Sequence, residues 1–275
     1  MGFKWNLSER YPNTYILELA ASLPFEFEVE YVSDRAPKHS VHGTTMTSAL
    51  QHHTVEFEQR FEKTFHLEAK GFNRSQVAFA RVALSNALGS IGYWYGQSIV
   101  KAANGTTPVA YFNNGLLSGV PSRCIAPRGF IWDEGFHQLL LQRWSPRITR
   151  TVFAHWLDLM NQDGWIPREQ ILDSEARAKV MTEVLIQDTE TGNPPTWFLV
   201  VGQMVDGLES SVDERSVNRD IQWLRAAYPR LLAWFNWFLK VHRGADGSFR
   251  WLQRSRMPDT MTPLTHASGM TDYPR

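Results

Sequence analysis

One eleven-residue segment concentrates side chains that could bind a polar ligand. Residues 127–137 read PRGFIWDEGFH and contain a guanidinium, two carboxylates, an imidazole and three aromatic rings. Trp132 and Phe130 offer flat apolar faces to a sugar ring, while Arg128 and Asp133 can form charge-assisted hydrogen bonds with hydroxyl groups. This combination predicts a saccharide subsite. The structural alternative is that the acidic residues lie in the first turn of a helix, where the helix dipole favours an anion.

Two later loops carry similar residue types. Residues 161–170 read NQDGWIPREQ, in which an Asp-Gly pair predicts a turn; the alternative to a cleft loop is a surface turn with an ion pair. In GNPPTW, residues 192–197, Asn193 is either a helix N-cap or a ligand-facing amide. The candidate substrate-binding residues are therefore Arg128, Phe130, Trp132, Asp133, Glu134, Phe136, His137, Trp165, Arg168, Glu169 and Asn193.

Other kinds of chemistry find little support in the sequence. It contains no Walker loop and no G-x-G-x-x-G, H-E-x-x-H or G-x-S-x-G motif. The His52-His53 pair is predicted to be exposed to solvent and not to bind a metal ion, and His137 lacks the further ligands that zinc requires. Cys124 has no activating neighbour in sequence. We therefore expect no metal and no cofactor.

Composition narrows the classes of partner. The 275 residues contain 28 basic and 28 acidic side chains, so no net field favours nucleic acid. There are 11 Trp, which either fill the core or stack on a flat ligand. No apolar run is long enough to span a bilayer, and the first residues lack a secretion signal. Three N-x-S/T sequons, at Asn6, Asn73 and Asn104, are compatible with a lumenal protein.

The patterning of apolar residues predicts a short β-rich segment followed by helices. Alternation over 25–32 predicts a strand, residues 15–19 a weaker one, and residues 33–53 a polar, turn-rich stretch. Helical spacing begins near Glu56 and predicts a helix starting at a Ser75 N-cap within residues 75–100, punctuated by glycines, followed by a loop at 104–121. Further helices are expected over residues 133–143, 147–161, 194–208 and 217–242, the last broken or kinked at Pro229. The expected domains are residues 1–54 and 55–275.

Four motifs together, three of them described above, resemble one protein family. They are PRGFIWDEGFHQLLLQRW, DGWIPREQILDSEARAKV, NPPT and SGMTDYPR, and FEQRFEKTF and GSIGYWYGQ upstream are similar as well. Their order and spacing resemble the processing α-glucosidase I enzymes, the mannosyl-oligosaccharide glucosidases of glycoside hydrolase family 63. The resemblance implies a mainly α fold: an incomplete (α/α)6 barrel (toroid) over 55–275, after the remnant of an N-terminal β-sandwich domain.

The resemblance also implies an activity. Family members remove the terminal α-1,2-linked glucose from the N-glycan precursor in the endoplasmic reticulum. They are inverting enzymes that need two carboxyl groups and no metal or cofactor. The implied partner is a glucosylated high-mannose N-glycan, not a nucleic acid, and full-length relatives are membrane-anchored.

The last motif departs from the family pattern. Where relatives read S-G-L/M-D-D-Y-P-R, with the first Asp as general acid, this chain has Thr271. Asp272 matches the second Asp and is the candidate catalytic residue, although it would have to shift register to replace the missing acid. The family's general base is expected beyond Arg275. We therefore expect a partial chain that is inactive by itself. The alternatives are a non-catalytic oligosaccharide-binding relative and a truncated product without function.

Overall fold

The computed structural model describes residues 16, 18–29, 41–102, 107–180, 182–210 and 213–249. The chain divides into two compact units between Phe57 and Glu58. All the candidate binding residues lie in the second unit. The predicted domain boundary at residues 54/55 remains a prediction.

Helices dominate the described residues. They are α1 (Gly43–Phe65), α2 (Arg74–Gly89), α3 (Ile131–Trp144), α4 (Pro146–Asp158), α5 (Ser174–Ala178), α6 (Thr182–Leu185), α7 (Trp197–Ser210) and α8 (Glu214–Val241), with a 3₁₀ turn at Ala245–Gly247. The four helices predicted between residues 133 and 242 are confirmed as α3, α4, α7 and α8. Helix α8 continues through Pro229.

The N-terminal strand predictions are wrong where the structure describes them. Residues 25–29 are not in a strand, and neither are residues 16, 18 and 19. A strand requires a hydrogen-bonded neighbour, and no described residue pairs with these segments. The predicted helix start near Glu56 is also too late, because residues 44–55 contain no glycine or proline and α1 already begins at Gly43.

Helix α2 also begins and ends earlier than predicted. Its N-cap is Asn73 instead of Ser75. The Asn73 Oδ1 accepts the Gln76 N–H at 3.0 Å and the Gln76 Oε1 accepts the Asn73 N–H at 2.9 Å, which forms a capping box. The helix ends at Gly89 instead of continuing toward residue 100, because the following aromatic-rich residues pair as a strand.

The strands form small sheets. Antiparallel β1 (Ile91–Gly96) and β4 (Asn114–Gly119) pair with Ile91 opposite Gly119. Strand β2 (Ile99–Lys101) lies between antiparallel β3 (Pro108–Ala110) and parallel β7 (Ile186–Gln187). Strand β5 (Gly129–Phe130) pairs with β6 (Glu169–Gln170). The expected loop at 104–121 therefore contains two strands, which the sequence pattern did not reveal.

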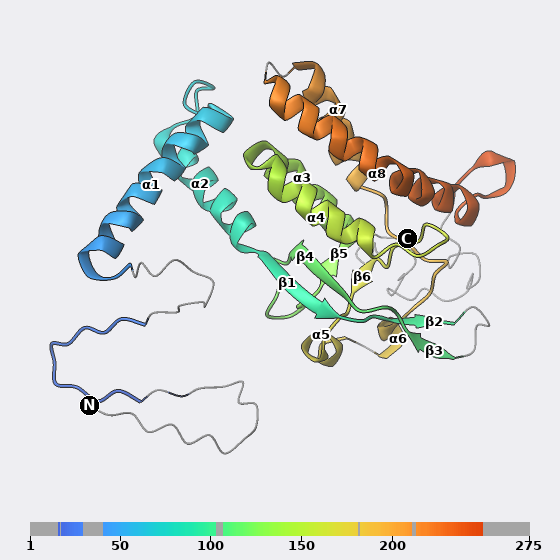
Figure 1. The fold of residues 1–275 in the computed structure, drawn as a ribbon, viewed down its shortest axis with the longest axis horizontal. Helices are drawn as coiled ribbons and strands as arrows, with labels where there is room; N and C mark the ends of the chain where they lie inside the picture. The colour runs from blue at the N-terminus through green and yellow to red at the C-terminus, as the bar shows by residue number, and fades with distance from the viewer. Residues whose placement is uncertain are drawn as a thin grey trace. The chain divides into compact units, whose positions relative to one another are not determined.

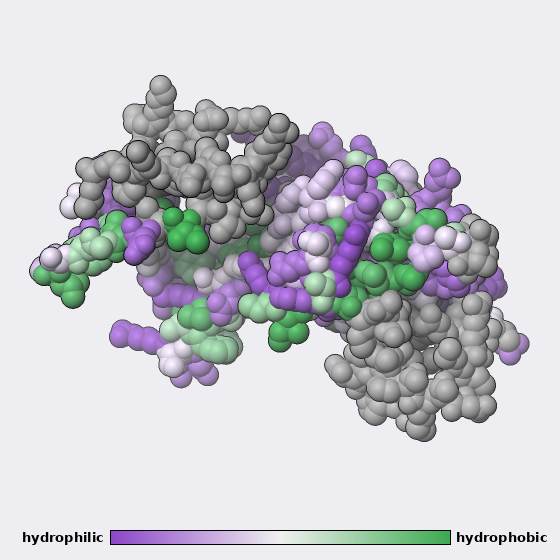
Figure 2. All heavy atoms as spheres, turned by 90° about the horizontal axis from the view of Figure 1, so that it is seen from below, coloured by the Kyte–Doolittle hydropathy of each residue, from purple (hydrophilic) through white to green (hydrophobic). Residues whose placement is uncertain are grey.

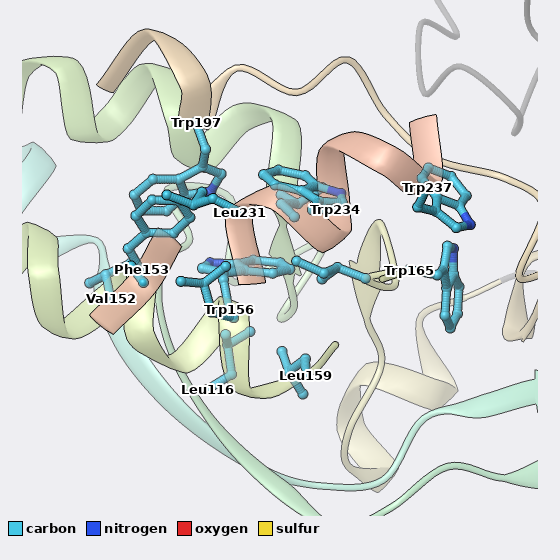
Figure 3. Close-up of a cluster of buried hydrophobic side chains, with 14 of the residues drawn as sticks. Leu116, Val152, Phe153, Trp156, Leu159, Trp165, Trp197, Leu231, Trp234 and Trp237 are labelled. Carbon is cyan, nitrogen blue, oxygen red and sulfur yellow. The ribbon is translucent and has the colours of Figure 1, made fainter. Parts of the chain in front are cut away.

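The core of the second unit lies where α3, α4, α7 and α8 pack, with β4 against α4 (Figure 1). Phe153 of α4 stacks on Trp197 of α7, with ring centroids 3.9 Å apart and planes at 10°. Figure 3 shows these rings in one cluster with Trp156 and Trp234. The interpretation that tryptophan fills the core is confirmed for all four labelled indoles of these helices and for Trp165, since each is at most 3% exposed.

The surface mixes polar and apolar residues. The face in Figure 2 carries separate apolar patches among polar side chains. Within the part of the chain that the structure describes, no helix combines the length and the apolar character needed to cross a membrane.

Candidate functional site

Strands β5 and β6 bring the first two motifs together. Gly129 pairs with Gln170 and Phe130 with Glu169. The Ile131 N–H donates to the Arg168 carbonyl at 3.0 Å, which extends the contact into the start of α3. Gly129 also lets β5 pack closely against β4, because a Cβ there would lie 2.6 Å from the Leu116 Cδ2. Side chains far apart in sequence thereby become neighbours.

The centre of the site is a carboxylate held between two guanidinium groups. The Arg128 Nε donates to the Glu169 Oε2 at 2.8 Å, and the Arg168 Nη2 lies 2.9 Å from the Glu169 Oε1. The three side chains are 13%, 6% and 9% exposed for Arg128, Glu169 and Arg168. Burial lowers the pKa of Arg168, Glu169 opposes that shift and Arg128 adds to it. Because two guanidinium groups surround one carboxylate, the three side chains together carry a net positive charge in a largely buried position.

Arg128 retains bonding capacity in this cluster. Its guanidinium lies 4.9 Å from the centroid of the Phe130 ring, a cation–π distance. Its Nη1 is buried and has no hydrogen-bond partner among the described residues. Leaving a buried donor unsatisfied costs about 1–3 kcal/mol, so a ligand oxygen at this position would be stabilising.

The first two turns of α3 add a carboxylate and two rings. The Asp133 side chain is exposed, but nearby protein desolvates its carboxyl and raises its pKa; Glu169 adds to the rise, while a backbone hydrogen bond and His137 oppose it. The Trp132 and Phe136 rings meet edge to face, with centroids 5.2 Å apart. Asp133 therefore belongs to the same electrostatic neighbourhood as Glu169.

Glu134 points into the protein. Its side chain is fully buried and accepts hydrogen bonds from the Gly119 N–H at 2.7 Å, from the Gln138 Nε2 at 2.6 Å and from the Ser118 hydroxyl. Burial raises the pKa of the Glu134 carboxyl, and the hydrogen bonds together with nearby His137 oppose the shift. The residue fastens α3 to β4, which is a positioning role.

Two indoles hold the loop that contains Asn193. The Trp165 Nε1 donates to the Thr191 carbonyl at 2.7 Å, and the Trp237 Nε1 donates to the Thr189 carbonyl at 3.2 Å. Figure 3 shows both indoles at one end of the core cluster. Asn193 is 3% exposed, and its Oδ1 has no partner within the described ranges.

The same loop reaches the first motif. The Thr196 hydroxyl donates to the Trp132 carbonyl at 2.6 Å. Gly135 allows this contact, since a Cβ there would lie 2.0 Å from the Thr196 Oγ1. All three sequence motifs therefore meet in one region.

The structure brings most of the candidate residues into one region, but some of them are buried against protein and others are exposed. Arg128, Phe130, Arg168 and Glu169 form the buried charge cluster, with Trp132, Asp133, Phe136 and His137 on α3 beside it. Glu134 and Trp165 are buried and bonded to protein, so direct contact with substrate stays a prediction for both. Thr271 and Asp272 lie outside the described residues.

Several supporting residues escaped the sequence analysis. Ser118 and Gln138 bind Glu134, and Gln187 Nε2 donates to the Glu169 carbonyl at 2.7 Å. Gln138 could have been found, because a residue four positions after Glu134 shares its helix face. The others come from distant segments. Among the residues with described positions, no group of three His, Cys, Asp or Glu could hold a metal ion.

The geometry defines a mainly helical domain with a charged, partly unsatisfied polar cluster. Comparison with known proteins shows that residues 41–275 match the glycosyl hydrolase family 63 C-terminal domain. The chain therefore belongs to glycosyl hydrolase family 63.

Three relatives illustrate the similarity. The chain is 39% identical to a mannosyl-oligosaccharide glucosidase and 35% identical to alpha-glucosidase 2, both of Arabidopsis thaliana, over 98% of its length. It is 30% identical to a probable mannosyl-oligosaccharide glucosidase of Schizosaccharomyces pombe over 91% of its length. The chain spans only 33%, 36% and 38% of these relatives, respectively.

Proposed function

We propose that the protein containing this chain is a glycoside hydrolase that removes the terminal α-1,2-linked glucose from the N-glycan precursor in the lumen of the endoplasmic reticulum. Family membership and the names of the relatives support this proposal. The described helices α3, α4, α7 and α8 would then form part of an (α/α)6 barrel.

The observation that carries the proposal is the Arg128–Glu169–Arg168 cluster, together with buried polar atoms of the same three motifs that have no partner among the described residues. A glucose unit presents hydroxyl groups that both donate and accept hydrogen bonds. The free Arg128 Nη1 would donate a hydrogen bond to a hydroxyl oxygen, while the Asn193 Oδ1 and the Asp133 carboxylate would accept hydrogen bonds from hydroxyl groups. The Trp132 and Phe136 rings would lie beside the apolar face of the sugar.

The chemistry that we propose is inversion by a general acid and a general base. The acid protonates the leaving oxygen while the base activates water on the opposite face of the sugar, so the reaction needs two separated carboxyl groups. In this scheme Asp133 and Glu169 bind and orient the sugar. Neither is the catalytic acid, because the family motif places that group at position 271.

Thr271 favours a second candidate, a relative that binds oligosaccharide without cleaving it. A threonine hydroxyl cannot act as a general acid near neutral pH. As the 275-residue chain stands, we therefore expect it not to hydrolyse an α-1,2-glucoside.

The decisive experiment compares the full-length protein with its Thr271→Asp variant on a glucosylated N-glycan. Measurable hydrolysis that appears only in Thr271→Asp would assign the acid position. Glycan binding without hydrolysis in both proteins would support the binding relative. Turnover by the unmodified full-length protein would support the proposed hydrolase and contradict only the role given to position 271.

A binding measurement tests the cluster independently of turnover. We expect Arg128→Ala to weaken binding of the glucosylated oligosaccharide about tenfold or more, since charge-assisted hydrogen bonds contribute ~1.5–3 kcal/mol. Arg147→Ala is the matched control, because Arg147 is exposed on α4. Equal affinity of the two variants in calorimetry would remove Arg128 from the site.

A further inference from the structure

The Asn73 sequon lies at an accessible point of the second unit. Asn73-Arg74-Ser75 follows the turn between α1 and α2, which Figure 1 shows. All three residues are exposed. The other sequons, at Asn6 and Asn104, lie outside the described residues. An exposed N-x-S triplet without proline is the acceptor for N-linked oligosaccharide in a lumenal protein.

The two groups that such a modification requires are free. The Asn73 Oδ1 is occupied by the Gln76 N–H, but its Nδ2 has no hydrogen-bond partner among the described residues. The same is true of the Ser75 hydroxyl, the group that defines the triplet. An N-glycosidic bond leaves the Oδ1 of the asparagine unchanged, so the helix cap and the glycan are compatible.

An apolar hollow adjoins the sequon. Its volume is about 540 Å³, and its lining residues are Leu67, Phe72, Ser75, Gln76, Phe79 and Ala80. Phe72 is 47% exposed and Phe79 is 76% exposed. Aromatic rings left open to water are favourable surfaces for the apolar face of a sugar. Because Phe72 precedes the acceptor directly and Ser75 lines the hollow, a glycan on Asn73 would reach it.

We propose that Asn73 carries an N-linked glycan whose first sugars cover this hollow. In the transfer, the Asn73 Nδ2 forms a bond to the anomeric carbon of an N-acetylglucosamine. The bond from that carbon to the diphosphate of a lipid-linked oligosaccharide donor breaks, the lipid diphosphate leaves, and the amide nitrogen loses one proton to a base of the transferase. The proposal rests on the lumenal location given under the proposed function.

The test uses the full-length protein produced in the secretory pathway of eukaryotic cells. Enzymatic removal of N-glycans in ¹⁸O-water should convert Asn73 to ¹⁸O-labelled aspartate, detected by mass spectrometry of its peptide. Ser75→Ala should abolish this label, while Ser75→Thr should retain it. An unmodified Asn73 in wild-type protein recovered from the secretory pathway would overturn the proposal.

A second measurement tests coverage of the hollow. Enzymatic removal leaves aspartate at position 73, which still caps α2, so a change in Tm reports the loss of sugar contacts. We expect a lower Tm after deglycosylation and the same lower Tm for Asn73→Asp. An unchanged Tm would refute the covering role. Binding of the glucosylated oligosaccharide by each sample separates the two proposals, since unglycosylated protein that still binds it would contradict only this one.

Discussion

Replacing Glu134 by alanine should destabilise the protein far more than replacing it by glutamine. Alanine removes the acceptor of the Gly119 N–H at 2.7 Å and of the Gln138 Nε2 at 2.6 Å. The Ser118 hydroxyl can rotate to another acceptor, but the Gly119 N–H is fixed in the backbone, and the Gln138 Nε2 loses its acceptor while its Oε1 stays bonded to the Thr149 hydroxyl. Each unsatisfied buried donor costs about 1–3 kcal/mol, so the free energy of unfolding should fall by about 2–6 kcal/mol.

Glutamine can keep most of this network. Its amide oxygen can accept the Gly119 N–H, while its amino group faces Gln138. Gln138 can then turn its amide over, because the Thr149 hydroxyl, which now donates to the Gln138 Oε1 at 2.8 Å, can accept instead. The exchange also removes a buried charge. We expect Glu134→Gln to change the free energy of unfolding by about 1 kcal/mol or less.

The assay is urea unfolding of each variant at neutral pH, with Cm and m compared. The matched control is Glu175→Ala on α5, whose surface ion pair with Lys179 should contribute less than ~1 kcal/mol. Equal losses for Glu134→Ala and Glu134→Gln would refute the argument from donor geometry. A loss for Glu134→Ala no larger than that of the control would refute the positioning role.

The pH dependence provides an independent check. Because the pKa of Glu134 is raised in the folded state above its ordinary value of 4.5, its favourable contribution is fully present below pH 4.5 and is lost as the pH rises through the folded pKa. The stability of the wild type relative to Glu134→Gln should therefore decline over that window. A relative stability that rises with pH would show that the hydrogen bonds to the carboxylate outweigh its desolvation.

Three further predictions concern the backbone at Gly164, the loop held by Trp165 and the loss of glycan binding at low pH. Gly164→Ala should lower the free energy of unfolding by about 2 kcal/mol or more in urea unfolding, since φ is +88° and a Cβ would lie 2.3 Å from a carbonyl oxygen of α8; Gly202→Ala, with open space, should not. Trp165→Phe should lower the free energy of unfolding by about 1–3 kcal/mol, because the Thr191 carbonyl loses the indole N–H that donates to it at 2.7 Å. The same variant should bind the glycan more weakly in calorimetry, and an unchanged affinity would show that the loop does not contribute to the binding site. Oligosaccharide binding should weaken as the pH falls through the raised pKa of Asp133, and titration of Asp133→Asn should show no such loss.

The sequence predicted the parts of the fold that depend on local pattern. Helices α3, α4, α7 and α8 follow from helical spacing. The structure brings the three sequence motifs together, while their contact with substrate stays a prediction. The β1–β4 pair was missed because the strand character of Tyr93–Tyr95 depends on partners 20–24 residues away, Gly115 to Leu117. Its register is a tertiary property that the local glycine-rich pattern did not reveal.

Within the site, residue types were easier to predict than directions. The aromatic and charged character of residues 127–137 indicated ligand binding, but nothing local shows that Glu134 points inward while Asp133 points outward. That difference depends on Ser118 and Gly119 of β4, which supply donors on one side of α3 only. Likewise, the Arg128–Glu169 pair arises from strand pairing across 41 residues of sequence.

The way Trp165 and Trp237 hold the Asn193 loop bears on how this region can change. Both indoles grip main-chain carbonyls at Thr189 and Thr191, and every amino acid supplies a carbonyl. These two hydrogen bonds therefore do not depend on which side chains occupy positions 189 and 191. The side chains of the loop can therefore change while its main-chain path stays anchored by the two indoles.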